Sequence, residues 1–213
     1  CASPAAPFQE MIDQGLERYF GVAIPTSTVQ EDGSTLHEFD PAQGPMCIRG
    51  GDFRSLTRQG TVDELLIYLQ GGGACWSELC IAFEEAGTSI PAAGILDPLL
   101  SANHFADWNL GYVPYCDGSL FTGDAEIDDD GDGEIDRYHH GLQNLTAALE
   151  AIRSEFPEPP KIVLSGLSAG AYGTILAGAL ARSIWPGVPI DLVADGGIGL
   201  GQPGVEAFIT DIL

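Results

Sequence analysis

The amino-acid sequence predicts an α/β fold, a three-layer sandwich in which a mostly parallel sheet is covered on both faces. Apolar runs of strand length alternate with segments of helical spacing, which is typical of this class. The 213 residues are 45% hydrophobic, enough for one sizeable core, and no apolar run approaches the 18 or so residues of a membrane span. We therefore expect one domain over residues 8–213, incomplete at its C-terminal end, after a flexible tether at residues 1–7.

The expected elements follow one another along the chain. Apolar residues at helical spacing predict a helix over Phe8 to Phe20, and the turn-rich residues 26–45 are expected to hold short antiparallel strands. Residues 52–57 and 64–69 are separated by a short turn and predict a β-hairpin. Further along we expect helices over 78–86, 140–156, 171–182 and from 205 onward, and strands over 109–115, 161–165 and 190–194.

The stretch Gly166-Leu167-Ser168-Ala169-Gly170 carries the clearest chemical signal. It follows an apolar strand and opens a helix of small residues, the context that a nucleophile elbow requires. In such an elbow the glycines stand where a Cβ would clash, and the serine lies at the tip of a sharp turn. Ser168 is therefore the candidate nucleophile of a serine hydrolase.

A second glycine cluster, Gln70-Gly71-Gly72-Gly73-Ala74-Cys75, directly follows the expected strand over 64–69. Three glycines after a strand are often an ordinary turn. Followed by an elbow, however, they stand in the chain order of the α/β-hydrolase parts, with an oxyanion hole before the nucleophile. We expect the backbone N–H groups of Gly73, Ala74 and Ala169 to stabilise the oxyanion of an acyl-transfer reaction.

The charge balance excludes one class of partner. Lysine and arginine number 8 against 31 aspartates and glutamates, a net charge of −23. Such a field repels phosphate backbones, so nucleic acid is excluded. It also disfavours encounter with anionic polysaccharide unless salt or calcium screens the charges. The acidity itself is typical of a protein that stays soluble in a saline or extracellular setting.

Five cysteines indicate an oxidising compartment, outside the cell or at its surface. Cys75 and Cys80 are close enough to close a short loop, which leaves Cys47 and Cys116 to pair, although four cysteines admit three connectivities. Cys1 precedes a tether rich in alanine and proline, as the lipidated cysteine of a mature bacterial lipoprotein does. The plain alternative is that the sequence simply starts there.

One acidic stretch has the spacing of a calcium loop. Counted from Asp128, acidic residues stand at positions one, three, five, seven and nine, with Gly133 at six. The expected calcium ligands are Asp128, Asp130, Asp132, Glu134 and Asp136. Position twelve is His139 rather than a bidentate glutamate, which predicts a weaker, structural Ca²⁺ site. The alternative is a solvated acidic loop, in which these carboxylates would repel one another without a cation.

From about residue 46 to residue 182 the chain resembles the pectin acetylesterase and Notum family of carboxylesterases, as a bacterial-type member. The matching segments are Leu66-Ile67-Tyr68-Leu69-Gln70-Gly71-Gly72-Gly73-Ala74-Cys75, Tyr115-Cys116-Asp117-Gly118-Ser119-Leu120-Phe121-Thr122-Gly123-Asp124 and Leu164-Ser165-Gly166-Leu167-Ser168-Ala169-Gly170. The resemblance implies an α/β-hydrolase fold, Ser168 as nucleophile, an oxyanion hole at Gly73, Ala74 and Ala169, and hydrolysis of O-acyl, above all O-acetyl, esters through an acyl-enzyme without an organic cofactor. It also implies the cysteine pairing given above.

Two departures from the family pattern matter. The family has tryptophan directly after the glycines, where this chain has Ala74, with Trp76 two places later, so the acyl pocket is expected to differ in shape. The acidic loop replaces a shorter, non-acidic segment, so metal binding does not follow from the resemblance. The substrate stays open between neutral acetylated polysaccharide, a lipid-modified substrate and a small ester.

The triad is incomplete in this sequence. An α/β-hydrolase places its acid and then its histidine after the serine, but His37, His104, His139 and His140 all precede Ser168. Spacing alone leaves an upstream histidine open as the base. Asp195 is expected to support the floor of the site. We therefore expect an N-terminal portion of a longer enzyme, inactive on its own; the alternative is a non-catalytic binding protein on a hydrolase scaffold.

Overall fold

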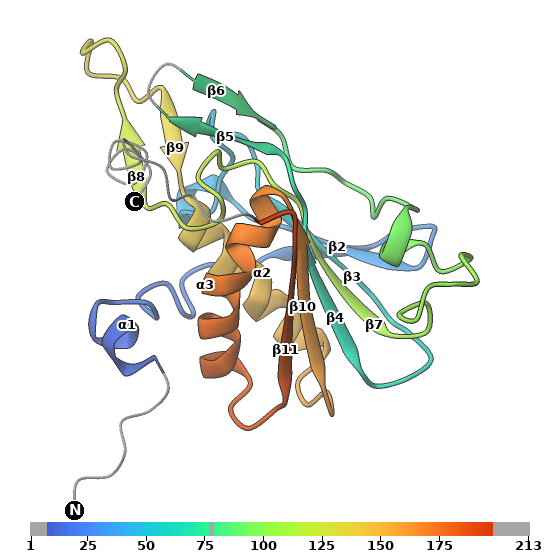
Figure 1. The fold of residues 1–213 in the computed structure, drawn as a ribbon. Helices are drawn as coiled ribbons and strands as arrows, with labels where there is room; N and C mark the ends of the chain where they lie inside the picture. Colours follow the sequence, from blue (N-terminus) through green and yellow to red (C-terminus); the bar gives the residue numbers. More distant parts are fainter. Residues whose placement is uncertain (1–7, 77–78, 198–213) are drawn as a thin grey trace, which may run out of the picture.

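The computed structural model describes residues 8–76 and 79–197 as a mixed α/β fold with a central sheet (Figure 1). The seven strands of this sheet lie in the order β1-β2-β3-β7-β4-β10-β11. The antiparallel half consists of β1 (Thr26–Val29), β2 (Ser34–Glu38) and β3 (Arg54–Arg58). The parallel half consists of β7 (Asn109–Val113), β4 (Leu65–Leu69), β10 (Ile162–Leu167) and β11 (Ile190–Asp195).

The register of the parallel strands brings their carboxyl ends to one edge. Gly166 of β10 lies beside Leu69 of β4, and Leu167 lies beside Asp195 of β11. Open α/β sheets bind their ligands at this edge. The segments that follow β4, β7 and β10 therefore converge on a common site.

Side chains alternate between the two faces of the parallel strands. Leu65, Ile67 and Leu69 of β4 face the larger core, which the helices α2 (Gly141–Glu155) and α3 (Ala169–Ile184) cover. Leu66 belongs to the smaller core on the opposite face. There the covering layer, in the described residues, is an irregular segment that includes the short 3-10 helix η2 (Gly94–Leu96), with Leu96 buried and Phe105 and Trp108 packed against the core.

The two long helices form where the sequence predicts them. In α2 the side chains of Leu142, Leu145, Leu149 and Ile152 recur at helical spacing and are buried. In α3 the buried positions are mostly alanine and glycine, which lets this helix lie close to β10 and β4. Among the described residues, no helix is long and apolar enough to cross a membrane.

The predicted hairpin between residues 52–57 and 64–69 is wrong. Both segments form strands, β3 and β4, but β7 lies between them in the sheet. The turn after β3 runs past the start of β7, where the N–H groups of Thr61 and Val62 donate to the carbonyl of Asp107 at 2.8 and 3.1 Å. A third strand from farther along the chain thus separates two strands that are neighbours in sequence.

Two predicted helices also differ from the structure. Residues 79–82 form the strand β6 (Leu79–Ala82), paired antiparallel with β5 (Gly73–Trp76), so the helix predicted over 78–86 is wrong. The first helix, α1, is confined to Gln9–Asp13, because the chain turns at Gly15 with a φ of 90°. The short elements η1 (Pro41–Gln43), β8 (Ala125–Ile127) and β9 (Arg137–His139) complete the fold. The helix predicted from residue 205 lies outside the described residues.

The described residues contain two disulfides, one long-range and one local. Cys47 is bonded to Cys116, and Cys75 is bonded to Cys80 across the β5–β6 hairpin, the pairing that the sequence analysis favours. Cys47, Cys75 and Cys116 are fully buried. The first bond joins residues 69 positions apart in the sequence and ties the segment between η1 and β3 to the turn after β7. Cys1 lies outside the described residues.

Candidate active site

Ser168 lies on a sharp turn between β10 and α3, at the carboxyl edge of the sheet. Its φ of 54° and ψ of −116° are unusual for a residue with a side chain. Its N–H group donates a hydrogen bond of 2.9 Å to the carbonyl of Asp195, and its own carbonyl accepts from the N–H of Ala171. The backbone is therefore fixed on both sides of the serine, whose side chain is exposed.

Glycines beside Ser168 permit close contacts between backbones. A Cβ on Gly170 would come within 2.0 Å of the carbonyl oxygen of Leu69, so only glycine lets α3 begin this close to β4. A Cβ on Gly71 would approach the carbonyl oxygen of Leu167 to 2.5 Å and the Cβ of Ser168 to 3.1 Å. The glycine cluster after β4 thus lies directly against the turn that carries the serine.

A cavity of about 330 Å³ opens at Ser168. Its wall includes Gly73 and Ala74 from β5 and Ala169 at the start of α3, so the structure brings together the predicted nucleophile and the three residues predicted to stabilise an oxyanion. The remaining wall is mostly apolar and consists of Trp76, Leu79, Ile81, Leu120 and Tyr172. The four predicted residues line one cavity, and their roles as nucleophile and oxyanion-hole donors stay predictions.

Leu120 and Tyr172 are cavity residues that the sequence analysis does not single out. Leu120 belongs to the turn after β7, and Tyr172 lies on the first turn of α3. The motif from Tyr115 to Asp124 carries part of the family resemblance, but nothing local in it shows that Leu120 faces Ser168. Tyr172 lies four residues after the serine, a spacing that places both on one side of the helix start.

None of the four histidines lines this cavity. His37 is buried between the hydroxyls of Ser27 and Thr57, at 2.8 and 2.9 Å, and His104 is exposed in the segment before β7, at the opposite edge of the sheet. His139 is buried, with Nδ1 3.0 Å from the carbonyl oxygen of Asp117. His140 contacts Gly44 and Glu126. None of these imidazoles therefore belongs to the described wall of the cavity at Ser168.

Asp195 contacts the elbow through its backbone. Its carbonyl accepts the hydrogen bond from the N–H group of Ser168, and the residue ends β11 beside Leu167. This is the position of a residue that supports the turn. Asp195 is not among the residues that line the cavity, so its expected place in the floor of the site stays a prediction.

The acidic loop forms the tip of a β-hairpin between β8 and β9, not a helix–loop–helix. Carboxylate oxygens of Asp128, Asp130 and Asp136 lie within 4.8 Å of one another, so three of the five predicted ligands come together. Hydrogen bonds from the N–H groups of Gly133 and Gly131 lower the pKa of Asp128. Asp132 instead accepts a hydrogen bond of 2.8 Å from the N–H of Glu134.

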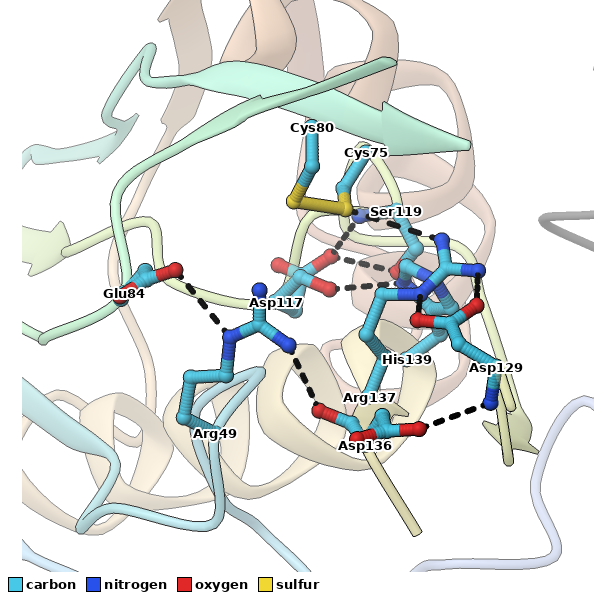
Figure 2. Close-up of a disulfide and its surroundings, with 10 residues drawn as sticks. All are labelled: Arg49, Cys75, Cys80, Glu84, Asp117, Ser119, Asp129, Asp136, Arg137 and His139. Atoms are coloured by element: carbon cyan, nitrogen blue, oxygen red, sulfur yellow. Dashed lines mark hydrogen bonds and ion pairs between the residues drawn. A yellow bond between two sulfur atoms is a disulfide. The ribbon is translucent and has the colours of Figure 1, made fainter. Parts of the chain in front are cut away.

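Two arginines join the acidic loop to the β5–β6 hairpin and to the segment that follows it (Figure 2). The largely buried guanidinium of Arg137 forms an ion pair with Asp129 and lies 3.7 Å from the Sγ atom of Cys75. Arg49 pairs with Glu84 at 3.1 Å and donates to the carbonyl of Asp136 at 2.8 Å. The loop and one wall of the cavity are therefore parts of one connected structure.

A serine on a sharp turn between an interior parallel strand and a helix, at the carboxyl edge of an α/β sheet, is the arrangement typical of the α/β-hydrolase class. Within that class the particular family is shown by sequence. The profile of the Pectinacetylesterase family matches residues 56–207. The chain belongs to this family of carboxylic ester hydrolases, and the expectation drawn from the resemblance is confirmed at that level.

Two similar proteins come from a plant. The chain is 28% identical to Pectin acetylesterase 4 of Arabidopsis thaliana over 166 residues, which are 70% of this chain and 40% of that protein. It is also 28% identical to Pectin acetylesterase 11 of the same plant over 161 residues, 67% of this chain and 39% of that protein. The chain thus spans about 40% of the length of the curated relatives it matches.

The buried His37 predicts a pH dependence of stability. Burial lowers the pKa of His37, so the folded protein holds a neutral imidazole, whereas the unfolded chain takes up a proton near the ordinary pKa of about 6.5. This contribution to stability is present above that pKa and is lost as the pH falls through the lower folded value. We expect His37 to reduce the free energy of unfolding by up to about 1.4 kcal/mol between pH 7.5 and 5.5.

Urea denaturation at the two pH values measures this effect. The decrease should be smaller in His37→Gln than in the unsubstituted protein. The matched control is His104→Gln, the same substitution at an exposed residue. It should show the same decrease in the free energy of unfolding between the two pH values as the unsubstituted protein. An equal decrease in all three proteins would contradict the prediction.

Proposed function

We propose that this protein is a serine carboxylesterase that hydrolyses O-acyl esters, O-acetyl esters of carbohydrates above all. The observation that carries the proposal is the position of Ser168, on a strained turn in one cavity with Gly73, Ala74 and Ala169. Membership of the pectinacetylesterase family supports the substrate class. The two disulfides are typical of an oxidising compartment and support action outside the cell or at its surface. Anchoring through a lipid on Cys1 is part of the same proposal.

The mechanism follows from the chemistry of an activated hydroxyl. A base removes the proton of Ser168 as its Oγ forms a bond to the ester carbonyl carbon. The N–H groups of Gly73, Ala74 and Ala169 stabilise the negative charge on the carbonyl oxygen. The alcohol leaves with the proton, and water then hydrolyses the acyl-enzyme to release the acid. Acid and base are contributed by residues other than those described.

Replacing the nucleophile tests the first step. We expect Ser168→Ala to lower kcat on p-nitrophenyl acetate by about 10⁴-fold or more, because no other group takes over the attack. The matched control is Ser165→Ala, the same substitution on β10 but outside the cavity, which should keep most of the activity if the protein is folded. Equal rates for Ser168→Ala and the unsubstituted protein would remove Ser168 from the mechanism.

A second measurement concerns the missing acid and base. We propose that the chain of residues 1–213 by itself is at least about 10³-fold slower than the full-length natural protein, since a triad without its base loses most of its rate. Both proteins are assayed with the same ester at equal concentrations of folded protein. Equal activity would show that residues 1–213 already contain the base. Inactivity of both would favour a binding protein on this scaffold.

We also propose that the acidic loop binds Ca²⁺ in a structural role. The clustered oxygens of Asp128, Asp130 and Asp136 support it, since calcium prefers several carboxylate ligands. The buried His139 is turned toward the carbonyl of Asp117 and replaces the bidentate glutamate of position twelve. A site without that ligand is expected to be weak, in the range of 10⁻⁴ to 10⁻³ M.

Thermal unfolding with calcium and with EDTA tests the metal site. At a calcium concentration 100 times the Kd, binding adds about 2.7 kcal/mol, which corresponds to a rise in Tm of roughly 5 to 10 °C. Asp130→Asn should abolish the rise, whereas Asp63→Asn, a control far along the chain from the loop, should retain it. A Tm that is the same with calcium and EDTA would leave the loop as an acidic surface only.

A further inference from the structure

The turn that follows β7 has an unusual backbone. Gly118, Leu120 and Phe121 have φ values of 70°, 59° and 65°. Two consecutive residues with side chains in the left-handed region are costly, and such strain persists only where the surroundings hold it. Leu120 is also one of the residues that line the cavity at Ser168. The strained turn is therefore part of the wall of the site.

Two buried side chains hold this turn. Oδ1 of Asp117 accepts hydrogen bonds from the hydroxyl of Ser119, from its N–H at 2.7 Å and from the N–H of Phe121 at 3.3 Å. The hydroxyl of Tyr115 accepts a hydrogen bond of 3.1 Å from the N–H of Leu120 itself. Asp117 is 1% exposed and Tyr115 is fully buried. These acceptors satisfy N–H groups that the left-handed backbone turns away from the sheet.

The same turn supports the opposite part of the cavity. The carbonyl of Gly118 accepts a hydrogen bond of 2.8 Å from the N–H of Cys75, on the strand that carries Gly73 and Ala74. Figure 2 shows Asp117 and Ser119 beside the disulfide of Cys75 and Cys80. A change in the turn would thus move both Leu120 and the strand of the predicted oxyanion hole.

We propose that Leu120 is a specificity-determining residue for the acyl group, and that Tyr115 and Asp117 are positioning residues that act through it. The inference rests on the proposed esterase function. The apolar wall at Ser168 suits the hydrocarbon part of an acyl group, and a fixed Leu120 limits the length of chain that this wall accepts. Mobility or truncation of Leu120 would therefore favour longer acyl groups over acetyl.

The test compares kcat/KM for p-nitrophenyl butyrate and p-nitrophenyl acetate in the full-length natural protein. We expect Leu120→Ala to raise the butyrate-to-acetate ratio about 10-fold, the effect of one or two methylene groups in a pocket. Tyr115→Phe, which keeps the ring and removes the acceptor, should raise the ratio in the same direction by about 3-fold. The matched control is Tyr112→Phe, a buried tyrosine of β7 on the opposite face of the sheet, which should leave the ratio unchanged.

Substitutions of Asp117 test its role separately. Asp117→Ala should raise the ratio and lower kcat by about 10²-fold, because the displaced turn also releases the strand of Cys75. Asp117→Asn keeps an acceptor oxygen and should restore a ratio close to that of the unsubstituted protein. Partial unfolding lowers the activity on butyrate and on acetate by the same factor, so it leaves the butyrate-to-acetate ratio unchanged. If Asp117→Ala does not fold, the ratios of Tyr115→Phe and Leu120→Ala still test the specificity role of Leu120 and the positioning role of Tyr115.

An unchanged ratio in Leu120→Ala would overturn the specificity role. A shifted ratio in Leu120→Ala with an unchanged ratio in Tyr115→Phe and in folded Asp117→Ala would overturn the positioning roles. Both failures are distinguishable from failure of the proposed function, in which Ser168→Ala would be as active as the unsubstituted protein.

Discussion

The strained backbone at Ser168 is the constraint on which the site depends. A residue with a side chain in this region costs of order 1–3 kcal/mol, and the fold must offset that cost. It does so through the parallel register of β10 and β11, which places the carbonyl of Asp195 under the N–H of Ser168. It also requires a glycine at position 170, where α3 begins against the end of β4. Contacts with the strands on both sides of β10 therefore hold the backbone of the serine in place.

The opposite wall of the cavity is held by different forces. The β5–β6 hairpin is separate from the seven-stranded sheet, so the strand hydrogen bonds of that sheet do not hold it, although Ala74 and Ala82 pack against the larger core. Instead a disulfide closes the hairpin, the turn after β7 accepts its hydrogen bond, and Arg137 lies against Cys75. Loss of Asp129 would leave the largely buried guanidinium of Arg137 without its ion-pair partner, which is costly. The disulfide, the hydrogen bond and the contact with Arg137 thus hold a hairpin that has only two strands.

The sequence allowed most of the parallel half and the elbow to be predicted, because their signals are local. Apolar runs identify β4, β7, β10 and β11, and the glycine spacing around Ser168 identifies the turn. The order of strands in the sheet has no local signal. Two strands that are adjacent in the sequence, β3 and β4, are naturally predicted to pair, and nothing in the sequence near them indicates that β7 lies between them. For β6 a local signal did exist, since Leu79, Ile81 and Phe83 alternate, which is a strand period. The contact of Leu120 with the cavity depends on long-range packing and could not be found this way.

The positions of the four histidines bear on which group could act as the base for Ser168. A general base must come within hydrogen-bond reach of the hydroxyl it deprotonates, about 2.6–3.2 Å or one water away. His139 is the histidine most closely associated with the turn that bears Leu120, yet its Nδ1 is engaged by the carbonyl of Asp117 and its ring is fully buried. The other three are bound elsewhere or lie at the far edge of the sheet. The exposed side chain of Ser168 is open to solvent, so the proposed mechanism requires an imidazole that approaches from the open side of the cavity.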